Sequence, residues 1–290
     1  MGAIEEVILR HDGRGINRVA RYLPEAYCLD AARFALDHPG RVLIATGFFV
    51  LHAGNSDTDG AMGAVVLAHA LRALGNDVRY VTDGPNVEVL RGMEDGSTEV
   101  VDFPWGERDA SRAVARRLLN DLRPALLLAV ERPGFAQGER YLNYRGMDIT
   151  LAMSKLDFLF EGFPTSIGIG DGGNEIGMGG LARELVLEEV TPYPALTKTA
   201  KTIVASTSLW GVYGLVTALS LLTDRDLLPT AQMQEHLLRK CVELNAADAT
   251  TGRREVTVDS HSLAECASVL EDLRKTVGAG MASSTQSSRR

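Results

Sequence analysis

The chain has 290 residues, 45% of them hydrophobic and 23% charged, which is ordinary for a globular protein with a buried core. Its formal net charge of -8 argues against nucleic acid or an anionic membrane as a partner, since both call for a basic surface. The three cysteines, Cys28, Cys241 and Cys266, are widely spaced and form no C-x-x-C pair, which argues against a zinc ribbon or a disulfide framework.

Both ends of the chain give compositional signals. The N-terminal segment is too acidic for a signal peptide, and no apolar run approaches the ~20 residues needed to span a bilayer. We therefore predict a soluble, cytoplasmic protein. Residues 278–290 are rich in Ser, Gly and Ala and predict a disordered tail. No linker divides the rest, so we expect a single domain over residues 1–277.

Strand-like and helix-like segments alternate along the chain. The expected helices are residues 16–37, 61–74, 109–122 and 215–222. The expected strands are the short apolar segments 41–46, 78–82, 125–130, 166–170 and 202–206. This alternation predicts a three-layer α/β domain with helices on both faces of a mostly parallel sheet, with a mixed sheet left open. Ligands bind such sheets at the carboxyl ends of the strands, so the loops that follow the strands are the candidate site.

The loop after the first expected strand carries two acids. It runs from Thr46 to Gly60 and contains Asp57 and Asp59, the second of which lies just before an expected helix. A carboxylate in that position can accept the free N–H groups of the helix as a cap. It can equally bind a metal ion together with acids from other loops, and both interpretations of Asp59 stay open.

The loop after the strand 125–130 begins with Glu131 and Arg132. A glutamate directly after a fully apolar strand is costly to bury without a partner, which can be Arg132 or a metal cation. Further along, Asn143 and Asp148 add polar groups before a helical stretch. Asp148 has helix capping as an alternative role.

The loop after the strand 166–170 gives the most specific signal. Residues 168–180 are rich in glycine and place Asp171, Asn174 and Glu175 within five positions. The segment matches neither a dinucleotide-binding loop nor a Walker A loop, and an acid at Asp171 would repel a pyrophosphate. Asp171 and Glu175 would face the same side if a helix begins at Gly172. The N-terminus of such a helix would also offer N–H groups to a substrate carboxylate.

Four acids, Asp59, Glu131, Asp171 and Glu175, are thus expected at one edge of the sheet. Converging acids repel one another unless a cation lies among them. Hard oxygen ligands suit Mg²⁺ or Mn²⁺, and neither a His pair nor a Cys cluster suggests zinc. We therefore predict that these four residues bind Mn²⁺ or Mg²⁺.

These loops resemble those of the D-glutamate cyclase family. The resemblance covers roughly residues 15 to 275, and its most specific segment is 170–179, Gly-Asp-Gly-Gly-Asn-Glu-Ile-Gly-Met-Gly. Further matching segments are Thr46-Gly47 with 58–60, Glu131-Arg132, and 208–213, where Leu209 stands at a position that is often Asn in the family. The resemblance implies an α/β fold, a divalent metal, and cyclisation of D-glutamate to 5-oxo-D-proline with loss of water.

Site roles follow from the loops and the resemblance together. The predicted catalytic residues are Glu175, Asp171 and Asp148. The predicted substrate-binding residues are Thr46, Gly47, Arg132, Asn143, Gly172, Gly173, Asn174, Ser208 and Trp210. Ser208 can hydrogen-bond a substrate carboxylate, and Trp210 can wall the pocket. The alternative for Trp210 and Tyr213 is that both are ordinary core residues of a helix.

Other functions stay open on the sequence. The same site would serve a related dehydratase or lyase, or a lactam hydrolase, acting on another amino acid. A Mg²⁺-dependent phosphate or nucleotide enzyme and a non-catalytic binding protein are the alternatives from other classes. The expected partner is a small amino-acid substrate, and the oligomeric state is left open, with a homodimer as one alternative.

Overall fold

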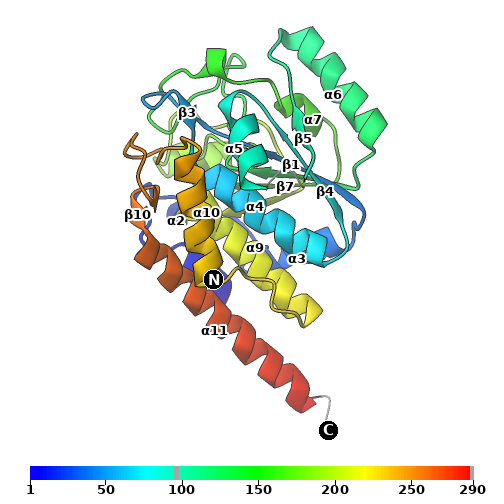
Figure 1. Ribbon diagram of the computed structural model, residues 1–290, viewed down its shortest axis with the longest axis vertical. Coiled ribbons are helices and arrows are strands. Elements are labelled where there is room, and N and C mark those ends of the chain that lie inside the picture. The colour runs from blue at the N-terminus through cyan, green and yellow to red at the C-terminus, as the bar shows by residue number, and fades with distance from the viewer. Residues whose placement is uncertain (95–97, 288–290) are drawn as a thin grey trace.

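A six-stranded, fully parallel sheet forms the centre of the computed structural model, which describes residues 1–94 and 98–287 (Figure 1). From edge to edge its strands are β5 (Val100–Asp102), β4 (Asp77–Thr82), β1 (Arg41–Thr46), β6 (Leu126–Val130), β7 (Ser166–Gly170) and β8 (Lys201–Val204). The sheet confirms the α/β fold, and its parallel pairings settle the question of a mixed sheet.

The strand order creates a crevice at one place. From β1 the chain moves outward to β4 and β5, then returns to β6 on the other side of β1 and continues outward to β7 and β8. The first strand therefore pairs with both β4 and β6, with Val42 beside Val78 and beside Leu126. Connections diverge at this switch point, and doubly wound sheets bind their ligands just outside the carboxyl ends of the strands there.

The strands are apolar on both faces because helices cover both. Successive residues alternate between two cores, so Val42 and Ile44 belong to the larger one, and Leu43 and Ala45 to the smaller one. The larger core lies under the helices α1 (Ala3–Ile8), α3 (Tyr27–Leu36), α4 (Thr58–Ala73), α9 (Ser208–Thr223), α10 (Ala231–Glu243) and α11 (Leu263–Ser287). The smaller core lies under α6 (Arg108–Leu122) and α7 (Asp157–Phe160).

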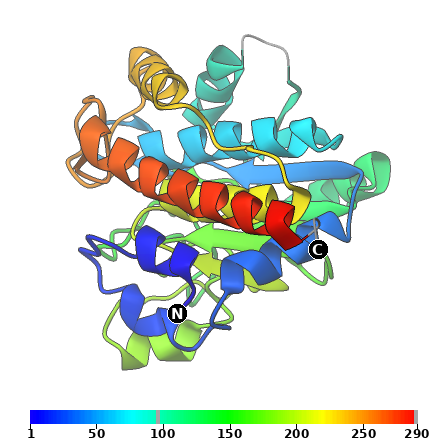
Figure 2. The same ribbon diagram turned by 90° about the horizontal axis from the view of Figure 1, so that it is seen from below.

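The larger side is more than one helix deep. Helix α9 is buried along most of its length and packs against α3, α4 and α11. Figure 2 shows α11 crossing the outside of α9. Shorter elements complete the fold: α2 (Asn17–Ala20), α5 (Pro85–Met93), α8 (Ala182–Leu187), a 3₁₀ turn at Thr150–Ala152, and the hairpins β2–β3 (Phe49–Val50, Asn55–Ser56) and β9–β10 (Thr257–Val258, His261–Ser262). None of the helices in this described part of the chain could span a membrane.

Two expectations near the ends of the chain differ from the structure. The helix expected over 16–37 is interrupted between α2 and α3, where Pro24 lacks the N–H group that a continuous helix needs. At the other end, α11 continues to Ser287, so residues 278–287 are helical rather than a disordered tail. A helix that is already nucleated extends at little cost through residues such as Ala, Met and Gln. Residues 288–290 lie outside the described part of the chain.

Candidate active site

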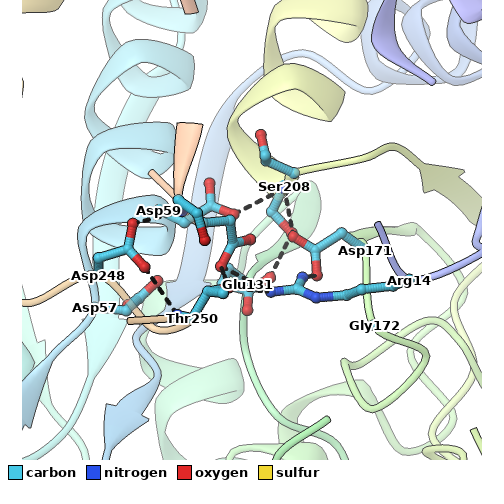
Figure 3. Close-up of polar contacts among 12 residues, drawn as sticks. Arg14, Asp57, Asp59, Glu131, Asp171, Gly172, Ser208, Asp248 and Thr250 are labelled. Carbon is cyan, nitrogen blue, oxygen red and sulfur yellow. Dashed lines mark hydrogen bonds and ion pairs between the residues drawn. The ribbon is translucent and has the colours of Figure 1, made fainter. Parts of the chain in front are cut away.

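The acid-bearing loops converge at the carboxyl end of the sheet (Figure 3). Carboxylate oxygens of Asp59, Asp171 and Asp259 all lie within 4.8 Å of one another. Glu131, Asp171 and Glu175 form a second group of the same kind, so Asp171 belongs to both. The four acids predicted as metal ligands are therefore brought together, and Asp259 joins them from the β9–β10 turn.

Asp59 caps a helix, but not its own. The N-cap of α4 is Asp57, whose carboxylate accepts the N–H group of Gly60 at 2.7 Å. Asp59 instead accepts the N–H groups of Ser208 at 2.9 Å and Leu209 at 2.6 Å, at the start of α9. The positive end of a long, buried helix thus faces this carboxylate and stabilises its negative charge.

Glu131 lies at a strained position next to α9. Its backbone has φ 44°, a left-handed conformation that is unfavourable for glutamate. The hydroxyl of Ser208 donates a hydrogen bond to its carboxylate at 2.5 Å. Burial, followed by the charges of Glu175 and Asp59, raises the pKa of Glu131 well above its ordinary value. This side chain therefore holds a proton readily when no cation is near.

The glycine-rich loop is not helical, which corrects the expectation for Gly172 and Gly173. Their N–H groups donate to the carboxylate of Glu175 at 2.7 and 2.9 Å, so they hold this loop rather than point at a substrate. Gly173 has φ +86°, which interrupts a right-handed helix and which only glycine adopts without strain. Asp171 and Glu175 still meet, because the loop folds back on itself.

Arg14 brings a positive charge into the acid cluster that sequence reasoning missed. Its guanidinium is ion-paired with Asp171 and lies 2.7 Å from the carboxylate of Asp259. It also lies over the ring of Tyr144, 4.7 Å from the centroid. The turn that carries it is held by Asp12, whose carboxylate accepts the N–H group of Arg14 at 2.9 Å. The converging acids are therefore partly compensated by the protein itself.

Asp259 was also missed, because nothing in the strand pattern points to the β9–β10 turn. Its backbone has φ 49°, and one oxygen of its buried carboxylate, Oδ2, has no hydrogen-bond partner among the described residues. Burial raises its pKa, but the charge of Arg14, the proximity of the Asp171 carboxyl group and the hydrogen bonds from Arg14 and Thr250 together outweigh this effect, and the net pKa is lowered. Asp248 shapes the turn by accepting the N–H group of Ser260 at 2.7 Å.

The pKa values of Asp171 and Asp59 show how crowded the site is. Burial raises the pKa of Asp171 well above its usual value, although Arg14 opposes this, and Glu131 adds to it. Burial, then Asp259 and Asp57, raises the pKa of Asp59 in the same direction. Without a further cation, the site favours protonated carboxyl groups over a full set of charges.

A small pocket opens over the second acid group. Its acidic lining residues are Glu131, Asp171 and Glu175, and its basic ones are Arg14 and Arg145. Of the residues predicted to bind substrate, Asn143 and Asn174 line it. The amide oxygen of Asn143 accepts the N–H groups of Arg145 and Met147, so that side chain also shapes the loop at the pocket mouth.

Several predicted substrate contacts have other roles. Arg132 is fully buried and pairs bidentately with Asp83 at 2.6 and 2.8 Å, away from Glu131 and from the pocket lining. It also donates to the carbonyl of Gly47, which fixes the Thr46-Gly47 bend. Gly47 has φ +108°, and a Cβ there would collide with Asn86. The expectation that Arg132 and Gly47 bind substrate is thus replaced by a structural role. The buried hydroxyl of Thr46 has no hydrogen-bond partner among the described residues, and its expected contact with substrate stays a prediction.

The residues at the start of α9 also differ in their roles. Ser208 lies at the acid cluster as expected, but its hydroxyl is engaged by Glu131. Trp210 and Tyr213 are fully buried and belong to the larger core, so the wall interpretation of Trp210 is wrong and the core interpretation holds. Trp210 packs beside His261, 4.6 Å between ring centroids.

Asp148 does not reach the acid cluster. It is exposed, and its carboxylate accepts the N–H group of Thr150 at 2.8 Å. Thr150 begins the 3₁₀ turn, whose N-cap position is Ile149. The hydrogen bonds from the hydroxyl and the N–H group of Thr150 lower the pKa of Asp148. Asp148 therefore contacts the start of this turn without occupying its N-cap, and its position does not support its expected catalytic role.

Comparison with known proteins now places the chain. The family model described as "D-glutamate cyclase-like, C-terminal" matches residues 4–274. The chain belongs to this family. It is also 30% identical over 232 residues to the human protein "D-glutamate cyclase, mitochondrial", a match that covers 72% of this chain and 38% of that relative. The matched region thus spans well under half of the human protein. The residues that the family model matches include every acid of the cluster.

Proposed function

We propose that this member of the D-glutamate cyclase-like family converts D-glutamate to 5-oxo-D-proline and water, with Mn²⁺ or Mg²⁺ bound at the acid cluster. The observation that carries the proposal is that two clusters of three acids share Asp171, which also lines the pocket. Membership of the family supports a cyclase.

The residues present fit a hard divalent cation. Asp59, Asp171 and Asp259 would hold it, since they supply converging carboxylate oxygens, and Oδ2 of Asp259 is buried without a hydrogen-bond partner in the described chain. Only Asp171 of these three lines the pocket, which leaves Glu131 and Glu175 facing the substrate. When bound, the ion would polarise the carboxyl group under attack and stabilise the developing oxyanion.

Proton transfer is assigned to the two glutamates of the pocket. Cyclisation removes two protons from the ammonium nitrogen, and both leave with a carboxyl oxygen as water. Glu175, held by the glycine loop, takes one proton from the ammonium group so that the neutral nitrogen can attack. Glu131, whose burial favours its protonated form, gives its proton to a carboxyl oxygen. As that oxygen leaves as water, Glu175 gives it the second proton and Glu131 takes the second proton from nitrogen, so both glutamates return to their starting forms.

Arg145 is suited to the carboxylate that does not react. It lines the pocket, donates to the carbonyl of Thr250 at 3.1 Å and lies over the ring of Tyr144. Within the described chain, no carboxylate forms an ion pair with it. A pre-positioned guanidinium with its charge available would bind one end of a dicarboxylic substrate while the other end reacts.

The phosphate alternative is less well supported. A phosphate-binding loop presents free backbone N–H groups to the anion. Here the N–H groups of Gly172 and Gly173 are taken by Glu175, and three acids line the same pocket. The first feature removes the donors that a phosphate would need, and the acids repel it.

Turnover of D- and L-glutamate by the purified chain tests the proposal. After chelation, Mn²⁺ or Mg²⁺ is added back, and mass spectrometry follows the loss of one water molecule. We expect 5-oxoproline from D-glutamate when metal is present. Lack of product from either enantiomer with both ions would refute the proposed reaction.

A further inference from the structure

We propose that Arg14 is a resident counter-cation of the Asp59, Asp171 and Asp259 group, and that it leaves Asp171 when a divalent metal binds. The inference rests on the metal site of the proposed function. It goes beyond that site because it assigns Arg14 a role: its guanidinium group and the metal ion alternate as the cation next to Asp171.

The contacts of Arg14 place its charge inside the metal-binding group. One terminal nitrogen, Nη1, pairs with Oδ1 of Asp171, and the other, Nη2, pairs with Oδ1 of Asp259. The guanidinium therefore spans two of the three carboxylates that would hold the metal. In Figure 3 it reaches in among the acids from the side opposite Asp57.

Asp171 has little room for both cations. Its Oδ2 already accepts the N–H group of Ser208 at 3.0 Å, and its Oδ1 is engaged by Arg14. A divalent ion bound to this carboxylate would lie in direct proximity to the guanidinium, where two positive charges repel strongly at low dielectric. If Arg14 leaves Asp171 when the metal binds, this repulsion is removed. The divalent ion then takes the place of the singly charged guanidinium group among the same acids.

The backbone of Arg14 is held in a turn, whereas its side chain borders the pocket. The carboxylate of Asp12 holds the turn through the N–H groups of Arg14 and Gly15, at 2.9 and 2.7 Å. The side chain is 16% exposed and lines the pocket, so it can withdraw into the pocket by rotation about its own bonds. The ring of Tyr144 already contacts the guanidinium and offers a surface on which it can rest after release.

Binding of Mn²⁺ alone to the metal-free chain tests the exchange, without any dependence on turnover. Isothermal titration would compare the wild type with Arg14→Gln, which removes the charge, and with Arg14→Lys, which keeps it but loses the fork that spans two carboxylates. Arg10→Gln is the matched control, because Arg10 comes from the same segment and pairs with Asp272 outside the pocket.

We expect Arg14→Gln to bind Mn²⁺ roughly tenfold or more tightly than the wild type, because a competing positive charge is removed. Arg14→Lys should show a smaller gain, and Arg10→Gln none. A structure with Mn²⁺ should show Arg14 separated from Asp171. Unchanged or weaker binding in Arg14→Gln would overturn the proposal, and Arg14→Lys decides by the same criterion if Arg14→Gln does not fold.

The outcomes separate this proposal from the proposed reaction. Equal Mn²⁺ affinity in wild type and Arg14→Gln, together with turnover of D-glutamate, would overturn the exchange and leave the reaction standing. Tighter binding by Arg14→Gln without turnover of any glutamate would support the exchange and refute the reaction. Failure of every form to bind Mn²⁺ would overturn the exchange together with the metal site.

Discussion

Two arginines pair with aspartates near the carboxyl end of the sheet, and they differ in how firmly they are held. Arg132 is fully buried, makes a bidentate pair with Asp83 and donates to two carbonyls. Arg14 is partly exposed at a pocket and bridges two aspartates that come from different segments. One ion pair is closed off from every ligand, whereas the other opens onto the space where a ligand would bind.

The two arginines differ in how well their charges are balanced by the neighbouring acids. Arg132 and Asp83 neutralise each other one to one, so this pair needs no further ion. Arg14 supplies one charge to a cluster in which burial raises the pKa of Glu131, Asp59 and Asp171. The cluster therefore remains short of positive charge, and a divalent ion can supply it. A buried arginine beside an aspartate thus indicates function only where the acids outnumber it.

The largest expected effect comes from breaking the closed pair. Arg132→Met leaves the carboxylate of Asp83 buried without its partner, which should cost about 3–5 kcal/mol in the free energy of unfolding. Denaturant unfolding measures this, with Arg14→Gln as the comparison. Arg14→Gln should lose much less free energy of unfolding, because the two acids that pair with Arg14, Asp171 and Asp259, can take up protons. Equal losses in the two variants would remove the distinction between them.

Asp171→Asn should act mainly on function. The change keeps the size of the side chain but removes the charge that both acid groups share. Loss of a residue that only supports a metal ligand typically lowers activity roughly 10–100-fold. Because Asp171 would bind the metal directly, we expect turnover to fall by more than this. The free energy of unfolding should change little, because repulsion among the acids is relieved. Normal turnover in this variant would make Asp171 a structural residue.

The acid cluster should also make stability depend on pH. Burial raises the pKa of Asp57 to about 7 in the folded state, above its ordinary value of 3.8. The folded state therefore binds this proton more tightly than the unfolded state, and stability should fall as pH rises between about pH 5 and pH 7. Thermal unfolding of the metal-free chain would show it.

Asp57→Asn is the matched control for this pH dependence, because asparagine also caps helices but does not titrate. Its melting temperature should fall less over the same range than that of the wild type. Parallel curves for the two proteins would show that Asp57 contributes nothing to the slope.

The smallest expected effect is that of Ser208→Ala. This removes the hydroxyl that donates to Glu131, a hydrogen bond to a group of the site rather than to substrate. The free energy of unfolding should fall by about 1 kcal/mol. Because the orientation of Glu131 is loosened, kcat should fall more than KM rises. A large rise in KM alone would instead place the hydroxyl on the substrate.

The sequence was sufficient where local pattern and topology act together. Strands such as 41–46 and 166–170 are apolar runs with clear ends, and the ends of parallel strands share one edge, so Asp59, Glu131 and Asp171 could be expected to meet. The spacing of Asp171 and Glu175 correctly indicated proximity, although it did so by a folded-back loop rather than by a helix.

Sequence reasoning failed where the site is completed from outside this pattern. Arg14 lies before β1, and Asp259 lies in the β9–β10 turn, well after β8, so neither directly follows a strand of the central sheet. Their contacts depend on tertiary packing of both chain ends beside α9, for which no local periodicity exists. A weak signal for Arg14 was present in Asp12-Gly13-Arg14-Gly15, since Asp and Gly favour the turn that presents it.

The central claim is that metal at the acid cluster enables the cyclisation of D-glutamate. Its most direct test is a Mn²⁺ titration of the chelated wild-type chain in which bound metal and 5-oxoproline formation are measured in the same samples. The account predicts no product without metal and a rate that rises in proportion to bound Mn²⁺. Equal rates with chelator, or bound Mn²⁺ with no product, would contradict it.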